Sequence, residues 1–168
     1  MPDFLIDFFR DFPPEVATVL LAMLPIAELR GALPAAIVVY DLPVWKAILL
    51  SIIGNMLPVY FLLIGFERVS QWLRVRFVFF DVLFNKLFDK TRQKLESKVD
   101  KYGVWALALF VAIPLPVTGA WTGTLAAFVF GLSKKKSFFA IFVGLLMAAT
   151  IVTVLTLATV NTVDAFRA

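Results

Sequence analysis

The sequence predicts an all-α protein that is integral to a membrane. Of its 168 residues, 61% are apolar and 17% are charged, whereas soluble domains average about 45–50% apolar and about 25% charged residues. The mean hydropathy is +0.92. Four long apolar runs follow one another, and most charges lie between them. This composition excludes an ordinary soluble domain and also a disordered chain, so we expect a single membrane domain over residues 1–168.

The first fifteen residues predict an amphipathic helix that lies in the membrane interface. Phenylalanines recur at helical spacing from Phe4 to Phe12, and aspartates at positions 3, 7 and 11 fall on the other side. Pro13 and Pro14 end the segment. Its four acids and single base do not match the positive start of a secretory signal peptide.

Two of the apolar runs predict full transmembrane helices. They cover Val44–Phe66, with one charge, and Ser137–Val160, with none. At a rise of about 1.5 Å per residue, each is about 35 Å long as a helix. That length matches a hydrocarbon core of about 30 Å crossed with some tilt.

The other two runs are interrupted by helix-breaking residues. The first, residues 16–40, contains Pro25, Gly31 and Pro34, and the second, residues 102–132, contains Pro114, Pro116, Gly119 and Gly123. Irregular backbone at membrane depth must be covered by protein or by a wet cavity. Each run therefore predicts either a re-entrant hairpin or one kinked transmembrane helix, and the breaks alone leave both interpretations open.

The distribution of positive charge favours a hairpin for the second broken run. The linker at residues 67–101 carries nine Lys/Arg and five Asp/Glu, and Lys134–Lys136 follow the broken run. A hairpin places linker and triplet on one face, in agreement with the positive-inside tendency. We therefore expect a cytoplasmic linker and both termini outside. Whether residues 16–40 re-enter or span stays open.

The same linker predicts an amphipathic helix on the cytoplasmic surface. Val69, Trp72, Leu73 and Phe80 follow helical spacing, and basic residues lie mostly elsewhere on the helical wheel. An aromatic and basic helix of this kind suits an anionic leaflet.

The two halves of the chain resemble each other at an offset of ninety residues. Lys46 then falls on Lys136, and Gly54 falls on Gly144. Each half, at residues 16–66 and 102–160, consists of a broken run, a short joint and an unbroken helix. An odd number of crossings in each half inverts the second relative to the first, as in the inverted repeats of many secondary transporters.

Two charges inside the first broken run form the main candidate site. Glu28 and Arg30 each cost roughly 2.5–3.5 kcal/mol at the centre of a membrane helix, so such residues are functional hypotheses by default. Desolvation and a neighbouring arginine act in opposite directions on the proton affinity of a carboxyl group, so Glu28 suits proton coupling. The alternative is that the two side chains pair or cap loose backbone and only hold the fold.

The second break and the first long helix supply further candidates for substrate binding. The break offers Thr118, Trp121 and Thr122, whose polar groups suit an ion or a head group, although any tight turn needs small residues. Asn55 lies at mid-depth in the helix predicted over Val44–Phe66. A single Asn in such a helix also serves simply to bond across helices.

Several classes of protein are excluded or disfavoured. The chain has no Cys and no His, which rules out disulfides, Cys/His zinc sites and His-based triads. No paired acids or nucleophile with a base is visible, so we expect no enzyme, no catalytic residues, no metal and no cofactor. The basic residues flank apolar runs, which indicates a membrane and not nucleic acid.

Two segments resemble the signatures of a known family. Residues 25–34 (PIAELRGALP), and residues 101–103 (KYG) with 112–123 (AIPLPVTGAWTG), are similar to the putative small multidrug export protein family of prokaryotes. Gly54-Asn55 followed by Pro58 also fits. The resemblance implies a multi-pass transporter of the prokaryotic plasma membrane that exports small molecules or solutes.

A more distant similarity is to the DedA superfamily, which pairs two re-entrant hairpins in an inverted repeat and is linked to lipid movement or proton coupling. DedA proteins carry arginines in the second hairpin, and the second break here has no charge. The resemblance leaves an alternative function, a lipid scramblase or lipid-carrier flippase. We expect membrane lipids and a small-molecule or lipid substrate as partners. We also expect a homo-oligomer, most simply a homodimer, because two full helices shield little of the polar breaks from lipid.

Overall fold

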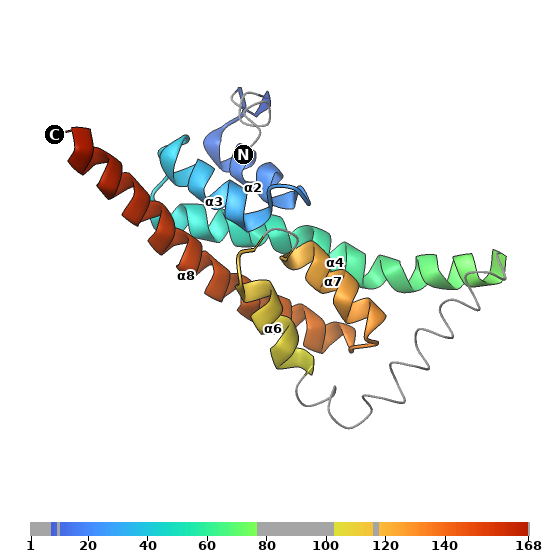
Figure 1. The fold of residues 1–168 in the computed structure, drawn as a ribbon. Helices are drawn as coiled ribbons and strands as arrows, with labels where there is room; N and C mark the ends of the chain where they lie inside the picture. The colour runs from blue at the N-terminus through green and yellow to red at the C-terminus, as the bar shows by residue number, and fades with distance from the viewer. Residues whose placement is uncertain (1–7, 10, 77–102, 116–117, 168) are drawn as a thin grey trace. The chain divides into compact units, whose positions relative to one another are not determined.

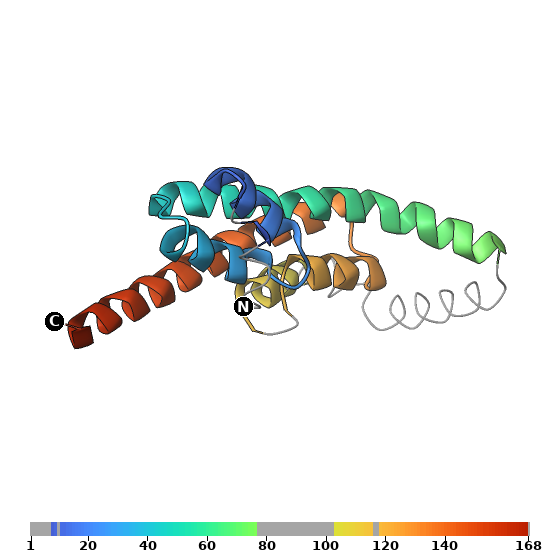
Figure 2. The same cartoon turned by 90° about the horizontal axis from the view of Figure 1, so that it is seen from above.

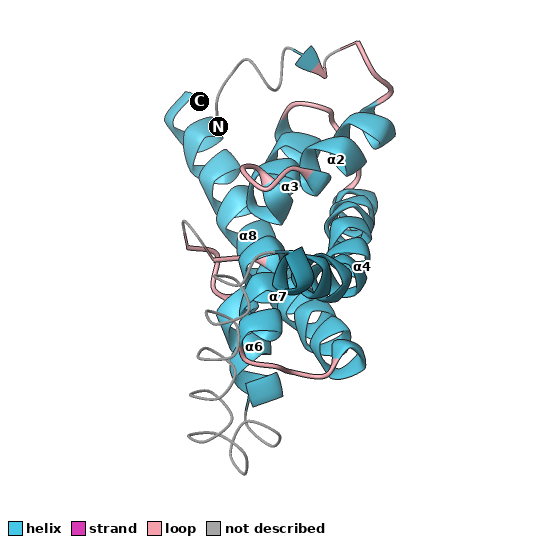
Figure 3. Cartoon of the chain, turned by 90° about the vertical axis from the view of Figure 1, so that its right-hand side faces the viewer, coloured by secondary structure: helices cyan, strands magenta, loops and turns pink. Residues whose placement is uncertain are grey.

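The computed structural model describes residues 8–9, 11–76, 103–115 and 118–167, and every regular element in them is a helix (Figures 1 and 3). The elements are α2 (Pro14–Met23), α3 (Glu28–Val38), α4 (Val44–Arg76), α6 (Val104–Ala112), α7 (Ala120–Val129) and α8 (Lys134–Arg167). The all-α prediction is confirmed for this part of the chain.

Two of the described helices, α4 and α8, are long and apolar enough to cross a membrane (Figures 1 and 2). Their apolar parts are Val44–Phe66 and Lys134–Thr162, and both contain the runs predicted to span. Helix α4 does not stop at Phe66 but continues to Arg76. The first part of the predicted linker helix is therefore the end of α4, whereas residues 77–101 lie outside the described residues, as does most of the predicted interfacial helix.

The four remaining described helices are short and occur as two pairs. They contain 9 to 11 residues each, which gives about 14–17 Å of helix, too short for a hydrocarbon core of about 30 Å. Helix α2 packs against α3, and α6 packs against α7 (Figure 3). Each broken run is thus two short helices packed together and not one continuous kinked helix.

The chain divides into two compact units. The first unit contains residues 1–57 and 145–168, and the second contains residues 58–144. In the first unit, α2 and α3 share an apolar cluster built largely from alanines, which permit close packing of helices. Its buried members are Phe9, Ala17, Leu21, Ala22, Ala32 and Ala35.

A glycine brings each long helix close to the first helix of a pair. In the first unit, a Cβ on Gly54 would lie 2.5 Å from the Val19 carbonyl oxygen and 2.7 Å from Ala22 Cβ. In the second unit, a Cβ on Gly144 would lie 2.6 Å from the Ala108 carbonyl oxygen and 2.8 Å from Val111 Cβ. The two units therefore use the same contact pattern, with contacted residues three apart, at the two glycines that the ninety-residue offset aligned.

The joints before the long helices are also alike. Asp41 and Gly131, ninety residues apart, both adopt left-handed backbone, with φ of 54° and 66°. Each directly precedes a residue whose N–H closes the preceding helix: Leu42 donates to the Ala36 carbonyl and Leu132 to the Ala127 carbonyl, both at 2.9 Å. Such left-handed closures are common at helix ends.

Candidate functional site

The break between α2 and α3 is a tight turn at residues 24–27. The Leu24 N–H closes α2 on the Leu21 carbonyl at 3.2 Å, and the Glu28 N–H donates to the Leu24 carbonyl at 2.9 Å. Pro25 lies in this turn, as predicted for a break. Glu28 has a φ of +47°, a left-handed conformation that is uncommon for any residue with a side chain and that often marks functional sites.

The Glu28 side chain is buried at the start of α3. It is 5% exposed, and it is the one buried charged side chain among the residues whose burial the structure describes. The first turn of a helix favours negative charge because its backbone N–H groups point there. Arg30 lies in the same turn and is half-buried. A carboxyl group and a guanidinium therefore occupy one end of α3, and a joint role for the two remains a prediction.

Two residues predicted to break the first run lie inside α3 instead. Gly31 and Pro34 are both helical, and α3 continues to Val38. Pro34 provides no N–H for the Arg30 carbonyl, so that oxygen loses its regular helical partner. The prediction of a break at these two positions was wrong, because a short helix tolerates one missing hydrogen bond and Gly31 keeps its own bond to the Ala27 carbonyl at 2.9 Å.

The second break runs from Ile113 to Gly119 and is shaped by one threonine and one glycine. The Thr118 hydroxyl donates to the Ile113 carbonyl at 2.6 Å or the Leu115 carbonyl at 2.9 Å, and it accepts from the Leu115 N–H at 3.1 Å. Gly119 has φ 150° and ψ −165°, a region open essentially only to glycine. Pro114 lies in this break, whereas Pro116 lies outside the described residues.

The other polar residues of the second break lie in the first turns of α7. The Thr122 hydroxyl bonds to the Gly119 carbonyl at 3.3 Å, and Trp121 is half-buried. Gly123 lies inside α7, so the prediction of a break there was wrong. A Cβ at this position would lie 2.6 Å from a Val111 methyl carbon. The glycine therefore allows α6 and α7 to pack closely. The threonine bonds all fold the local backbone, and a role in substrate binding stays a prediction.

Asn55 lies on the buried face of α4 together with a residue that the sequence analysis missed. Asn55 and Ser51 are both fully buried. The Asn55 Nδ2 donates to the Ser51 carbonyl at 3.1 Å, but Asn55 Oδ1 and Ser51 Oγ have no hydrogen-bond partner among the described residues. Ser51 could have been found from the sequence, because it lies four residues before Asn55 and therefore on the same face of the predicted helix.

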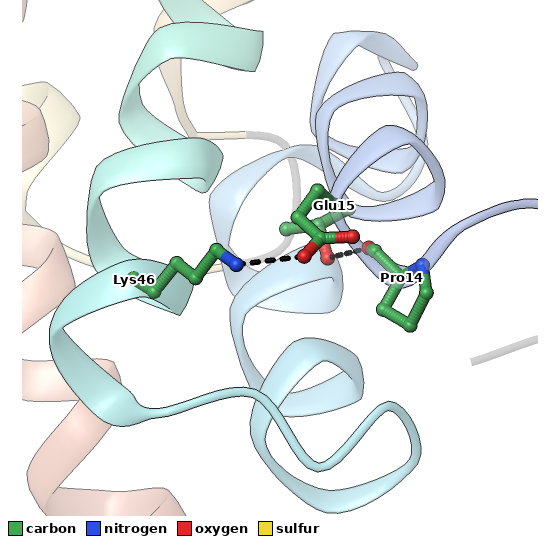
Figure 4. Close-up of polar contacts among 4 residues, drawn as sticks. Pro14, Glu15 and Lys46 are labelled. Carbon is green, nitrogen blue, oxygen red and sulfur yellow. Dashed lines mark hydrogen bonds and ion pairs between the residues drawn. The ribbon is translucent and has the colours of Figure 1, made fainter.

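The first helix pair is also tied to α4 by an ion pair. The Lys46 ammonium donates to the Glu15 carboxylate at 2.7 Å (Figure 4). This hydrogen bond, and the nearby positive charge, hold the pKa of Glu15 below its ordinary value. The sequence placed Glu15 in the interfacial segment and missed the pair, because nothing local links residues 31 positions apart.

The predicted site residues fall into two groups. Glu28, Arg30 and Asn55 belong to the first unit, and Thr118, Trp121 and Thr122 belong to the second. Among the described residues, no three acidic, cysteine or histidine side chains come together in a way that could hold a metal ion. Of the predicted site residues, those in the first unit therefore include a buried charge and an unpartnered amide oxygen, whereas the two threonines in the second have locally bonded hydroxyl groups.

These features are those of a membrane protein whose described elements are all helices and whose chain has two interrupted segments. The chain belongs to the family described as "Putative small multi-drug export protein", whose sequence profile matches residues 28–151. The matched region begins at Glu28, directly after the first break, and contains the second break and Asn55. No curated protein and no solved structure matches the chain. The comparisons support neither the similarity to DedA proteins nor the scramblase alternative that followed from it.

Proposed function

We propose that this protein exports small molecules across a membrane, without enzymatic chemistry, and that Glu28 couples export to protons. The observation that carries the proposal is the Glu28 carboxyl group, buried and in a left-handed conformation at the start of α3. An ionisable group inside an apolar segment is expensive to insert, so its presence favours a role in transport. Membership of the export family supplies the class of activity.

The proposed cycle uses only charge and position. A buried carboxyl group that exchanges its proton changes the net charge of its surroundings and so changes the affinity for a cationic substrate. The positive charge of Arg30, two residues along, keeps the net charge of the pair from becoming negative when Glu28 is ionised. Proton and substrate then compete for the same carboxylate, which is sufficient for an exchange of one for the other.

We further propose that both helix pairs re-enter the membrane and that the two halves form an inverted repeat. Support comes from the short helices, which cannot span singly, and from the matched contacts of Gly54 and Gly144. Introduced cysteines test this proposal, because the chain has none of its own. In intact prokaryotic cells, Ser133→Cys and Ser97→Cys are both expected to be protected from a membrane-impermeant thiol reagent. Labelling of Ser133→Cys alone would show that the second broken run spans.

Interrupted backbone must be shielded from lipid, so we propose that the protein works in the plasma membrane as a homodimer. Mass determination in detergent, combined with activity after reconstitution, tests this. A monomer that retains full transport would contradict it.

The central test compares two glutamates of the first unit. Glu28→Gln removes the buried charge with little change in size, and Glu15→Gln removes a half-exposed charge at the other end of the same helix pair. In proteoliposomes with an imposed pH gradient, we expect Glu28→Gln to reduce transport of a cationic dye such as ethidium to the background level. Glu15→Gln is expected to stay close to the wild type. Unchanged transport by Glu28→Gln would limit Glu28 to a structural role.

The second candidate function is translocation of lipids, favoured by the half-buried Arg30 guanidinium, which suits a lipid phosphate. A dithionite assay with a fluorescent phospholipid tests it. Lipid movement that requires Arg30, together with the absence of gradient-driven dye transport, would establish this alternative in place of the exporter.

A further inference from the structure

Two side-chain oxygens without a hydrogen-bond partner lie one helical turn apart on the buried face of α4, in the first unit. Ser51 and Asn55 are 0% exposed, yet Ser51 Oγ and Asn55 Oδ1 have no hydrogen-bond partner among the described residues. Buried polar atoms are normally paired, because an unpaired one costs free energy. Tyr40, Ser137 and Thr153 also have an unpartnered side-chain oxygen, but none of them has a second such residue within one helical turn.

The orientation of the Asn55 amide is fixed by its neighbour. Its nitrogen lies 3.1 Å from the Ser51 carbonyl oxygen, and a carbonyl oxygen only accepts, so the opposite orientation would bring two acceptors together. The nitrogen end of the Asn55 amide therefore has a partner for one of its two N–H groups, and the end without a partner is the oxygen. Ser51 lies one turn earlier on the same face of the helix.

A proline adds a third acceptor in the same stretch of α4. Pro58 lies inside the helix and has no N–H, so the Gly54 carbonyl has no partner in the regular helical pattern. Within two turns, the helix thus presents an amide oxygen, a hydroxyl and a backbone carbonyl. Acceptors outnumber free donors, so hydrogen bonds among these groups cannot satisfy them.

The other long helix, α8, shows that the shared packing does not require these polar groups. Ninety residues along, Ser51, Asn55 and Pro58 correspond to Ile141, Leu145 and Ala148, all three apolar and buried. Gly54 and Gly144 nevertheless make the same close contacts. The oxygens on α4 are therefore additional to what holds a long helix against its short partner.

We infer that Ser51 and Asn55 form part of a binding site for a dehydrated monovalent cation, with Na⁺ as its ligand. Neutral amide, hydroxyl and carbonyl oxygens are ligands for hard cations, and carbonyls freed from interrupted membrane helices bind Na⁺ in transporters. The site itself is independent of export. Its consequence, that export depends on Na⁺ as well as on protons, rests on the proposed function.

Thermal unfolding of the purified full-length protein tests the site without any transport measurement. The intrinsic tryptophan signal is followed in NaCl, KCl and choline chloride at equal ionic strength. A ligand that binds only the folded state raises its melting temperature as the ligand concentration increases. We expect a saturable rise of a few degrees in NaCl and no comparable rise in KCl or choline chloride.

Three variants assign the effect to the two residues. Asn55→Leu introduces the residue found ninety positions later, and Ser51→Ala is a smaller change in case the first variant folds poorly. Both are expected to lose the Na⁺-dependent rise, whatever their own melting temperature. Ser137→Ala removes an equally buried and unpartnered hydroxyl in the second unit and is expected to keep the rise.

The inference is overturned if the wild type melts alike in all three salts, or if Asn55→Leu and Ser51→Ala keep the Na⁺ response. The first result would mean that these oxygens bind water or no ligand, and not Na⁺. The proposed function fails separately: a Na⁺ response without any dye transport would leave the site in place and remove the exporter.

Discussion

The two helix pairs share a layout but differ in chemistry. The pair α2 and α3 carries a buried carboxyl group, a half-buried guanidinium and an ion pair to α4. The pair α6 and α7 carries no Asp, Glu, Lys or Arg within its two helices, and its break is organised by Thr118 and Gly119. Matching contacts at Gly54 and Gly144 show that one packing scheme can hold both. The difference teaches that the architecture does not require charge at a break, so the charges of the first pair need another explanation.

The largest expected effect concerns the feature that the pairs have in common. Alanine at Gly54 or Gly144 would place a Cβ 2.5 or 2.6 Å from a backbone carbonyl oxygen. A helix backbone cannot easily move away from such a clash. We expect each variant to lose about 3 kcal/mol or more of stability by overpacking, measured as a large fall in melting temperature.

Gly65→Ala is the matched control for this test, because the same helix α4 leaves nothing within 4 Å of a Cβ at that position. It should be neutral or stabilising by up to about 1 kcal/mol. Equal melting temperatures for Gly54→Ala and Gly65→Ala would show that the close contact has no energetic role.

The next effect concerns the backbone of the second break, which uses a glycine and a threonine where the first break has a buried charge. Gly119→Ala forces a side chain into backbone that glycine alone adopts readily, at an expected cost of about 1–3 kcal/mol. Thr118→Val removes the hydroxyl bonds of the same turn, at an expected cost of about 1–2 kcal/mol, whereas Thr118→Ser keeps the hydroxyl. Melting temperatures of the three variants check the order. A Thr118→Ser variant as unstable as Thr118→Val would mean that the threonine methyl group, and not the hydroxyl, shapes the break.

The smallest effect concerns the ion pair that distinguishes the first pair. Because Lys46 lowers the pKa of Glu15, the folded state binds the Glu15 proton less tightly than the unfolded state does. The resulting stabilisation is present above the ordinary pKa of 4.5 and is lost as the pH falls below it. Lys46→Met should therefore melt slightly below the wild type at pH 7. The difference in melting temperature should shrink as the pH falls from 4.5 through the lowered pKa of Glu15 in the folded state, and it should also be smaller in high salt. A gap that is independent of pH would assign the effect to packing of the lysine stem.

Much of this molecule could be predicted from its sequence because the relevant signals are local. Length and hydropathy predicted the apolar parts of α4 and α8, and prolines marked the turns at Pro25 and Pro114. The offset of ninety residues paired Gly54 with Gly144, and the structure gives both the same contacts. These features follow from helix length and backbone chemistry, which a single segment contains.

The features that escaped prediction depend on contacts between segments. Gly31 and Gly123 look like breaks in a sequence, but both are helical, and the space around Gly123 is filled by a neighbouring helix. The ion pair of Glu15 with Lys46 and the unpartnered oxygen of Ser51 become visible only after packing. The charged residues after Phe66 predict the end of the membrane helix there, but charged residues can also continue a helix, and α4 extends to Arg76.

The most direct test of the claim that the first pair carries the chemistry is proton release on substrate binding. Purified protein in a weakly buffered detergent solution is mixed with ethidium while a pH indicator is followed. We predict that the wild type releases protons as the dye binds, that Glu15→Gln does the same, and that Glu28→Gln releases none. Proton release from Glu28→Gln equal to that of the wild type would contradict the account.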